Sequence, residues 1–360
     1  MLAVLCGVAG RASGVELADG KVSINGAGGA AFAITTHNEL ETSALRADPD
    51  GNFRNAEFNL ALAVRITPRI TIATQLFFDN IDGANAGLDW TFAEVAFDKA
   101  FKLRMGKIKL PLGISSETEA IGTLRPFYSL PHVVYGPTGL ATESYYGIGI
   151  TGELFSERRW SLSYDVFGGS TSIETIEPYD RLRQPLVRGT VTEDDEDDVT
   201  GLFGGRLILG TPIDGLSLRV AGYRGSVAGD SLSALLLSLD FEGDRWLVRA
   251  EAFRFREDSI SHGGYLEVAR FITPELQIAL QLEAMRTHAH GVPESSSLLW
   301  HESVALGLNY WFTPGMVMKA AISGIRGNRL AFPRSLDDAL LAGTLAEETA
   351  FFTLGTQFSF

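Results

Sequence analysis

Apolar and polar residues alternate along most of this chain with a period of two. From about residue 21 onward, apolar side chains fill every second position in successive runs, such as residues 58–66, 70–78, 160–166, 276–282 and 304–312. Successive side chains of a β-strand point to opposite faces, so this pattern predicts strands with one apolar and one polar face. The runs are about ten residues long, which suits a tilted strand that crosses an outer membrane.

Short turns and longer loops alternate between the predicted strands. The seven short turns lie at 66–69, 98–100, 155–159, 210–212, 242–244, 272–275 and 312–315. Four of them contain a Thr-Pro pair, and proline ends a strand because it fixes φ and has no N–H to leave unpaired. The eight longer polar loops are expected at 37–52, 79–88, 110–145, 169–199, 226–231, 257–262, 288–300 and 328–348. Seven turns and eight loops connect 16 strands.

This organisation predicts an all-β fold, a 16-stranded antiparallel transmembrane β-barrel with short periplasmic turns and longer external loops. A soluble sandwich would hide its apolar face, and it would not alternate short and long connections. The barrel must close, because an open sheet edge has no hydrogen-bonding partner in lipid. The expected location is the outer membrane of a Gram-negative bacterium, with outer-membrane lipid and lipopolysaccharide as surroundings.

The last twelve residues form an amphipathic strand, and they place Phe352, Leu354, Phe358 and Phe360 on one face. A final strand that ends in phenylalanine resembles the assembly signal of bacterial outer-membrane proteins. Phe360 is therefore the residue expected to meet the barrel-assembly machinery.

Composition agrees with a barrel and excludes other classes. A chain of 360 residues suggests two or three domains, but the strand count reduces this to one barrel domain, residues 15–360. No apolar run approaches the roughly 18 residues that a membrane-spanning helix needs. The net charge of −14 argues against nucleic acid as a partner. In a barrel, the 45% hydrophobic content is mostly an outer coat around a wet interior.

Residues 1–14 are predicted to be a signal peptide, because a short apolar stretch precedes small residues. The alternative is a first strand or helix, but Gly7, Gly10 and Gly14 interrupt either period. A lipoprotein at Cys6 is disfavoured, since Leu5 stands where a small residue normally precedes the lipidated cysteine. Cys6 is the only cysteine, so removal of this segment leaves no thiol chemistry.

Inward-facing residues decide what passes through a barrel. The alternation places charges of both signs on this face, namely Glu57, Arg65, Arg104, Arg219, Arg249, Glu251, Glu267, Glu283 and Lys319. The alternative interpretation is that these charges have no selective role, because any polar residue is suited to face the water inside a wide barrel. Sixteen strands enclose more space than side chains of the wall can fill, so a selective pore needs a segment that folds inward.

The third loop, residues 110–145, is the candidate for that segment. Within 124–137 it contains three prolines and three aromatic rings, those of Phe127, Tyr128 and Tyr135. This composition favours a constriction packed on the inner wall over a free, solvated loop. The alternative is an ordered external loop over the mouth of the barrel.

The entrance to this loop also carries a family resemblance. Residues 104–113 read RMGKIKLPLG, and they are followed by Arg125-Pro126 and by LPHVVY at 130–135. These residues resemble porins of the phosphate-selective O/P type and their uncharacterised relatives, in which a G-[KR]-x-K-x-P-[FL]-G stretch enters the constriction loop. The resemblance implies a homotrimeric porin that passes small solutes or ions. Its basic groups nearest the constriction would be Arg104, Lys107, Lys109 and Arg125.

The sequence departs from the phosphate-selective pattern in its charge balance. Residues 110–145 contain Arg125 as their only lysine or arginine, against Glu117, Glu119 and Glu143. Anion-selective pores need a dense ring or ladder of cations. A general or weakly selective channel therefore fits better, with constriction residues Arg104, Lys107, Lys109, Glu117, Glu119, Arg125 and Tyr135.

Two further clusters attract attention without defining a site. The acidic run 193–198 is expected to be a solvated loop tip, and the alternative is a divalent-cation site that bridges to lipopolysaccharide. It lacks the glycine and spacing of a calcium loop. His288, His290 and His301 fit a loop rim better than a surface metal site. No cofactor or metal is predicted.

Passive diffusion through a water-filled pore is the leading function, and the chain is not expected to be an enzyme. A hydrolase at the rim would need His132, His262 or His301 beside a serine or carboxylate, and no catalytic motif supports this. The third hypothesis is a non-conducting scaffold or sleeve for an electron-transfer or surface partner. The solute, the ion selectivity and the oligomeric state are left open.

Overall fold

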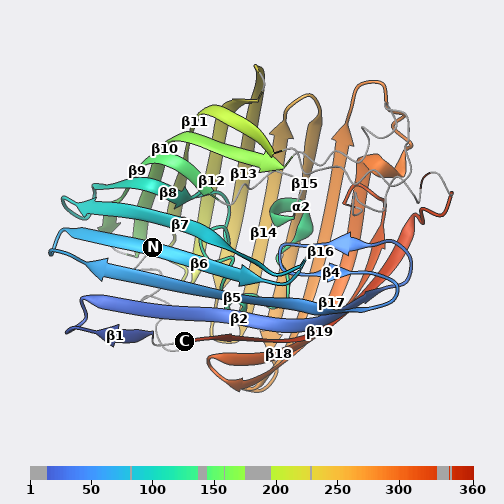
Figure 1. Cartoon of the computed structure of the whole chain (residues 1–360), viewed down its shortest axis with the longest axis horizontal. Helices are drawn as coiled ribbons and strands as arrows, with labels where there is room; N and C mark the ends of the chain where they lie inside the picture. The colour runs from blue at the N-terminus through green and yellow to red at the C-terminus, as the bar shows by residue number, and fades with distance from the viewer. Residues whose placement is uncertain are drawn as a thin grey trace.

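The strands of the computed structural model form one closed barrel (Figure 1). The structure describes residues 14–81, 83–136, 144–157, 159–174, 196–227, 229–330, 340 and 343–360. Residues 1–13 of the predicted signal segment 1–14, Glu143 and the acidic residues 193–195 lie outside this part. Asp197 and Asp198 fall in a barrel strand and not in a loop.

Sixteen antiparallel strands make the barrel wall, as predicted. They are β2 (Val22–Thr35), β5 (Asn52–Arg65), β6 (Ile70–Asp79), β7 (Asn85–Ala96), β8 (Lys102–Lys109), β9 (Ser144–Glu157), β10 (Trp160–Glu174), β11 (Glu196–Gly210), β12 (Leu216–Val227), β13 (Asp230–Glu242), β14 (Trp246–Arg256), β15 (Ile260–Phe271), β16 (Leu276–His288), β17 (Trp300–Thr313), β18 (Met316–Arg326) and β19 (Glu348–Ser359). The sheet counts 17 strands because β1 (Val15–Leu17) adds a short hairpin arm to β2.

The two ends of the wall meet and leave no open edge. β19 pairs with β2 in a register that sets Phe358 opposite Gly28. The terminal Phe360 extends this pairing, because it exchanges two backbone hydrogen bonds with Gly26, at 2.9 and 3.0 Å. Closure satisfies backbone groups that would otherwise face lipid.

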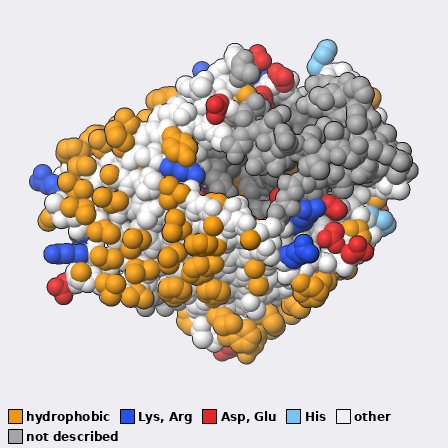
Figure 2. Space-filling view, viewed as in Figure 1, with side chains coloured by type: hydrophobic (Ala, Val, Ile, Leu, Met, Phe, Trp, Pro, Cys, Tyr) orange, Lys and Arg blue, Asp and Glu red, His pale blue; other side chains and the backbone are white. Residues whose placement is uncertain are grey.

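Strand alternation produces an apolar outer wall. In β17, Val304, Leu306 and Leu308 are 50–58% exposed on the outside, whereas Ala305 and Asn309 are buried inside. Figure 2 shows the resulting field of hydrophobic side chains over the strands drawn in blue in Figure 1. Such a band is what a barrel wall needs in order to face hydrocarbon.

Exposed aromatic rings mark the short-turn end of the barrel. They include Phe97, Phe101, Phe155, Trp160, Trp246, Tyr310 and Phe312. Aromatic girdles of this kind occupy the membrane–water interface. Together with the alternation of the wall, the girdle agrees with the predicted place in the bacterial outer membrane. Among the described residues, no helix is long and apolar enough to cross a membrane.

Two connections differ from the prediction of long external loops. Only residues 228–229 separate β12 from β13, and only 257–259 separate β14 from β15. These hairpins are as tight as the periplasmic turns.

In the Thr-Pro turns, the threonine side chain stabilises the turn. The Thr67 and Thr273 hydroxyls each accept hydrogen bonds from two backbone N–H groups of their own turn.

Candidate functional site

The third loop lies inside the barrel, where its described part, residues 110–136, covers much of the inner wall. It contains the short helices η1 (Gly122–Leu124) and α2 (His132–Tyr135), and α2 lies within the ring of strands in Figure 1. Leu110, Leu112 and Val133 are fully buried. The interpretation as a lid outside the barrel mouth therefore does not describe residues 110–136.

An apolar core forms on one side of the lumen. Leu112, Val134 and Tyr135 of the loop belong to one buried cluster with Leu236 and Phe253 of the wall. The expected wet interior is wrong for this side of the barrel. Inward positions on β13 and β14 break the polar pattern with large apolar residues, and these need a partner that only the inward loop provides.

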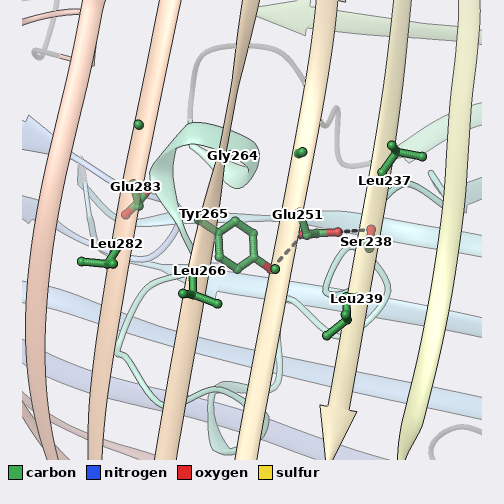
Figure 3. A pocket seen from close by; sticks show the side chains of 12 residues that line it. Leu237, Ser238, Leu239, Glu251, Gly264, Tyr265, Leu266, Leu282 and Glu283 are labelled. Atoms are coloured by element: carbon green, nitrogen blue, oxygen red, sulfur yellow. Dashed lines mark hydrogen bonds between the residues drawn. The ribbon is translucent and has the colours of Figure 1, made fainter.

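Glu251 is the hydrogen-bonding centre of this region. Its carboxylate accepts the hydroxyl groups of Tyr135, Ser238 and Tyr265, and it accepts the backbone N–H of Ile114 at 2.9 Å. Burial, followed by the Glu251 charge, raises the pKa of Tyr135 well above its ordinary value. Tyr135 therefore stays protonated and donates. Through Ile114 and Tyr135, both ends of the described loop are bound to this one wall carboxylate. Figure 3 shows the hydrogen bonds that the same carboxylate accepts from Ser238 and Tyr265 of the wall.

Lys319 of β18, four strands along the wall from Glu251, holds the middle of the loop. Its ammonium group donates to the carbonyl oxygens of Gly122, Arg125 and Phe127 and to the Gln357 side chain, at 2.6–3.1 Å. Lys319 is only 2% exposed. A buried ammonium is tolerated only where such acceptors surround it, so Lys319 is a fastener and not a solvated pore charge.

Further wall side chains bind loop backbone in the same way. Arg249 donates to the Leu124 carbonyl at 3.1 Å, and Arg219 donates to the Ile114 carbonyl at 3.2 Å. Both guanidinium groups also contact Asp240. Between the strands of these two arginines and β18, Glu283 of β16 accepts the Val133 N–H at 3.0 Å, and Asn309 of β17 donates to the Pro126 carbonyl at 2.7 Å.

The basic residues predicted for the constriction are neutralised by neighbours. Arg104 pairs with Glu94 at 2.8 Å, and Lys109 pairs with Asp89 at 2.8 Å. Arg125 lies 3.7 Å from Glu57, and its guanidinium donates to the Glu119 carbonyl. The Glu119 carboxylate lies 3.9 Å from the Lys109 ammonium. The described residues therefore show no ladder of unpaired cations along the loop.

Glu117 is the carboxylate of the loop most strongly held in its ionised form. It pairs at 2.7 Å with Arg206, a wall residue that also contacts Asp165 at 2.8 Å. Burial opposes ionisation of Glu117, but Arg206 outweighs this effect, and the pKa of Glu117 falls to about 2. Arg206, Asp165, Asp89 and Glu94 were missed in the sequence, although Asp165 and Glu94 each follow the alternation between apolar residues. Asp89 stands at a register shift between Leu88 and the buried Trp90, which alternation alone does not reveal.

Two predicted site residues lie apart from the loop. Arg65 is exposed at the short-turn end of β5. The Lys107 ammonium donates to the Leu88 carbonyl and lies 5.8 Å from the centre of the Tyr146 ring, which is 59% exposed on the outer wall. Strand alternation continues without a register shift from Met105, which is 57% exposed on the outer wall, to Lys107 two positions later. Lys107 therefore points away from the lumen.

The first loop also folds inward, which the sequence reading missed. Its β3 (Leu40–Glu41) and β4 (Arg46–Ala47) form a small hairpin. Leu40 and Leu45 are buried in a cluster with Tyr128 of the third loop. The Ser43 hydroxyl accepts the Leu130 N–H at 3.3 Å. The only sequence signal was a few apolar residues in an otherwise polar segment.

Below the third loop, at the short-turn end, lies a cavity of about 300 Å³. Trp90, Phe271 and Trp311 line it together with Arg219 and Arg249, and loop residues 114–126 form part of its lining. It is a vestibule of mixed polarity, large enough for small hydrophilic solutes.

The histidines do not form one site. His301 is buried, with its ring centre 6.4 Å from that of His132, whereas the exposed His288 stacks on His262 at 5.5 Å. His301 stands at the loop end of β17, as predicted for the rim, but its side chain is buried inside the barrel. In the part of the chain that the structure describes, no group of three or more His, Cys, Asp or Glu is placed to hold a metal ion.

A closed 16-stranded wall with an inward third loop defines a porin-like outer-membrane barrel. The resemblance to solved structures agrees with this class. The outer membrane channel DcaP of Acinetobacter baumannii aligns over 97% of this chain and 100% of its own, with a TM-score of 0.59 and 9% identity.

Two other solved structures show the same fold. The anion-selective porin from Comamonas acidovorans aligns over 94% of this chain and 99% of its own, with a TM-score of 0.56 and 10% identity. A trimer form of OmpT, an outer membrane protein of Vibrio cholerae, aligns over 94% and 99%, with a TM-score of 0.58 and 10% identity. No family model and no curated protein matches the sequence.

Proposed function

We propose that this protein is an outer-membrane porin that lets small hydrophilic solutes or ions diffuse passively across the membrane. The observation that carries the proposal is the third loop, fastened inside a closed 16-stranded barrel by wall side chains such as Lys319, Glu251 and Arg249. An inward loop narrows a barrel that would otherwise be too wide to select. Transport, and not catalysis, is the role that this arrangement supports.

Weak selectivity is part of the proposal. The cations at Arg104, Lys109 and Arg206 each face a carboxylate within 2.8 Å. Paired charges attract neither ion strongly, whereas a phosphate-selective pore needs cations in excess. The paired charges therefore support a general channel over the phosphate-selective type that residues 104–113 resemble.

A homotrimer is the oligomer that we propose, supported by the trimer form of the OmpT barrel with the same fold. Light scattering of the detergent-purified protein tests this oligomeric state, because it measures the mass of the assembly. A monomer at micromolar concentration would contradict this part of the proposal without affecting the barrel or the pore.

Single-channel recording in a planar bilayer tests the function. We expect ohmic steps, and in a salt gradient we expect a reversal potential near zero. Arg125→Ala should shift that potential toward cation preference, since the Glu57 carboxylate would then lose the guanidinium that lies 3.7 Å away. Arg69→Ala, at an exposed turn, serves as the control.

The packing of the lumen supports one competing function. Gln357, Asn309 and Lys319 are at most 2% exposed, although they face the inside of the barrel. A lumen filled to this degree would also suit a non-conducting scaffold for a partner protein. Correctly folded protein that gives no conductance would reject the porin and favour that scaffold.

A further inference from the structure

Basic residues gather on the outer wall at its loop end, on β12 to β16. We call Arg224, Arg254, Arg256, His262 and Arg286 the cationic rim; all five are exposed. Strand register arranges them in two neighbouring rows. One row runs Arg224, Ser233, Arg256, and the other runs Leu235, Arg254, His262, Arg286, each residue directly opposite the next.

The arginines of the rim differ from those inside the barrel because they lack acidic partners. Among the described residues, Arg224, Arg254 and Arg256 form no ion pair, whereas Arg286 pairs with Glu302 at 2.8 Å. Asp230, Glu257 and Asp258 follow at the hairpin tips, beyond the two rows. The three unpaired guanidinium groups lie on β12 and β14, on either side of β13. Arginine binds phosphate through two parallel hydrogen bonds, so this grouping suits an anion.

An apolar groove lies directly below the cationic rim. It has a volume of about 550 Å³. Its floor includes Ala252, Gly264 and Ala284, which are the next outward positions below Arg254, His262 and Arg286 on the same strands. Figure 3 shows Leu237 and Leu239 on one side of this floor and Leu266 and Leu282 on the other.

Close packing of the strands explains why the floor is hollow. A Cβ on Gly264 would lie 2.3 Å from the Glu251 carbonyl oxygen, so no larger residue fits without moving the wall. The groove is therefore a rigid feature of the strand pairing. It opens toward the hydrocarbon side of the wall, where no water competes for the space.

We propose that the cationic rim and the groove together bind one phosphorylated lipid of the outer leaflet, with its phosphate on the arginines and an acyl chain in the groove. The rim lies at the loop end, which is external in barrels of this type, and therefore at the depth of the outer head groups. A free phosphate ion would use the rim alone. The groove adds an apolar surface for an acyl chain, which a lipid has and a free phosphate ion lacks.

A second copy of this chain fits the same face poorly in a twofold contact, in which this face would meet itself. A twofold interface sets a patch against itself, which would bring Arg224, Arg254 and Arg256 of both copies together. Like charges in contact oppose such an interface. The lipid proposal depends on the outer-membrane location and not on solute passage, so the two can fail independently.

Native mass spectrometry of the full chain, stripped of lipid in detergent, tests the site. The probes are doubly phosphorylated lipid A, phosphatidylcholine and inorganic phosphate alone. We expect wild type to bind lipid A, and R224A/R254A/R256A to bind it about tenfold or more weakly, because charge-assisted hydrogen bonds are lost. The matched control, R69A/K99A/R270A, removes three exposed cations at the short-turn end and should change the affinity less than about twofold.

The groove is tested separately with A252L/A284L, which fills the floor without touching the rim. We expect weaker binding of lipid A with no change in single-channel conductance, since both side chains face outward. Equal losses in the two triple variants, equal binding of phosphatidylcholine, or equal binding of inorganic phosphate would overturn the proposal. Dissociation of an oligomer by A252L/A284L with lipid binding unchanged would assign the groove to a second copy and would also overturn it.

Discussion

Charged side chains inside this barrel act first as fasteners. Lys319, Arg249 and Arg219 donate hydrogen bonds to loop carbonyl oxygens. Glu251 and Glu283 accept hydrogen bonds from loop N–H groups. Such side chains satisfy backbone groups of a segment that has little regular structure of its own. The same residues would be free pore charges if the loop lay elsewhere.

Lys319→Met is expected to loosen the third loop. The change removes the ammonium that satisfies three buried loop carbonyls, which destabilises the folded barrel by about 2–3 kcal/mol. The heat-induced shift in electrophoretic mobility should occur at a lower temperature, and single-channel currents should become noisier. Lys99→Met at an exposed turn is the control. Quiet currents and an unchanged transition would show that the loop does not depend on Lys319.

Glu117→Gln is expected to shift selectivity toward anions, because Arg206 then retains only Asp165 as a counter-charge. The pKa of Glu117 is lowered to about 2, so its ion pair stabilises the fold above the ordinary pKa of 4.5 and is lost only as pH falls through about 2. The difference in reversal potential between wild type and E117Q should therefore be the same at pH 7 and about pH 4. Glu275→Gln in an exposed turn should change nothing.

Single elements acquire their role from the wall around them. The helix α2 has four residues and no capping side chain, and its His132 lies beside the His301 ring, yet the helix is buried. Helices this short are not stable alone, so α2 exists because Glu283 and the apolar cluster hold it. The first loop follows the same rule, since its hairpin is buried only against Tyr128 and the wall.

The helix α2 is expected to lose stability in mild acid. Burial lowers the pKa of His132 from 6.5 to about 4, so the unfolded chain binds a proton before the folded chain does. The stability that the neutral imidazole contributes is complete above pH 6.5 and is lost as pH falls from 6.5 toward about 4. Hydrogen exchange of residues 110–136 should accelerate over this range in wild type.

His132→Phe tests that assignment, because it fills the site with a ring that cannot titrate. Exchange of residues 110–136 should then lose most of its dependence on pH between 4 and 6.5. His37→Phe, at an exposed position, should leave the dependence as in wild type. A variant H132F that keeps the full acid sensitivity would assign the effect to His301 or Glu283.

At the scale of the whole molecule, the outer wall and the closed sheet determine where the protein resides. Large apolar residues such as Leu306 are more than half exposed, a state that water would penalise and lipid does not. Closure through β19 and β2 removes the edges that lipid could not satisfy. The membrane is thus the solvent for which this surface is built.

Arginine substitutions on β17 should report the depth of the wall in the bilayer. Leu306→Arg, near the middle of the strand, is expected to destabilise the inserted barrel by about 2–4 kcal/mol, whereas Phe312→Arg at the turn end should cost about 0–1 kcal/mol. Urea unfolding in lipid vesicles measures both. Leu306→Ala controls for the loss of the side chain. Equal effects at the two positions would mean that the wall is not embedded as described.

The sequence predicted the fold better than the site. Alternation placed Val304, Leu306 and Leu308 on one face, and counting turns led to 16 strands, because both depend on local patterns. Lys107 was assigned to the constriction through the family resemblance of residues 104–113, but it shares the outward face of β8 with Met105. The partners Arg206 and Asp89 lie far from Glu117 and Lys109 in the chain, so no local signal connected them.

Local physics therefore determined the strands, the polarity of the two faces and the expectation that the third loop turns inward. Tertiary structure alone decided which inward charges are neutralised, that one side of the lumen is dry, and that three unpaired arginines lie above an apolar groove. The physical reason is the register between strands. Alternation along one strand fixes a face, but only pairing across strands decides which charges meet.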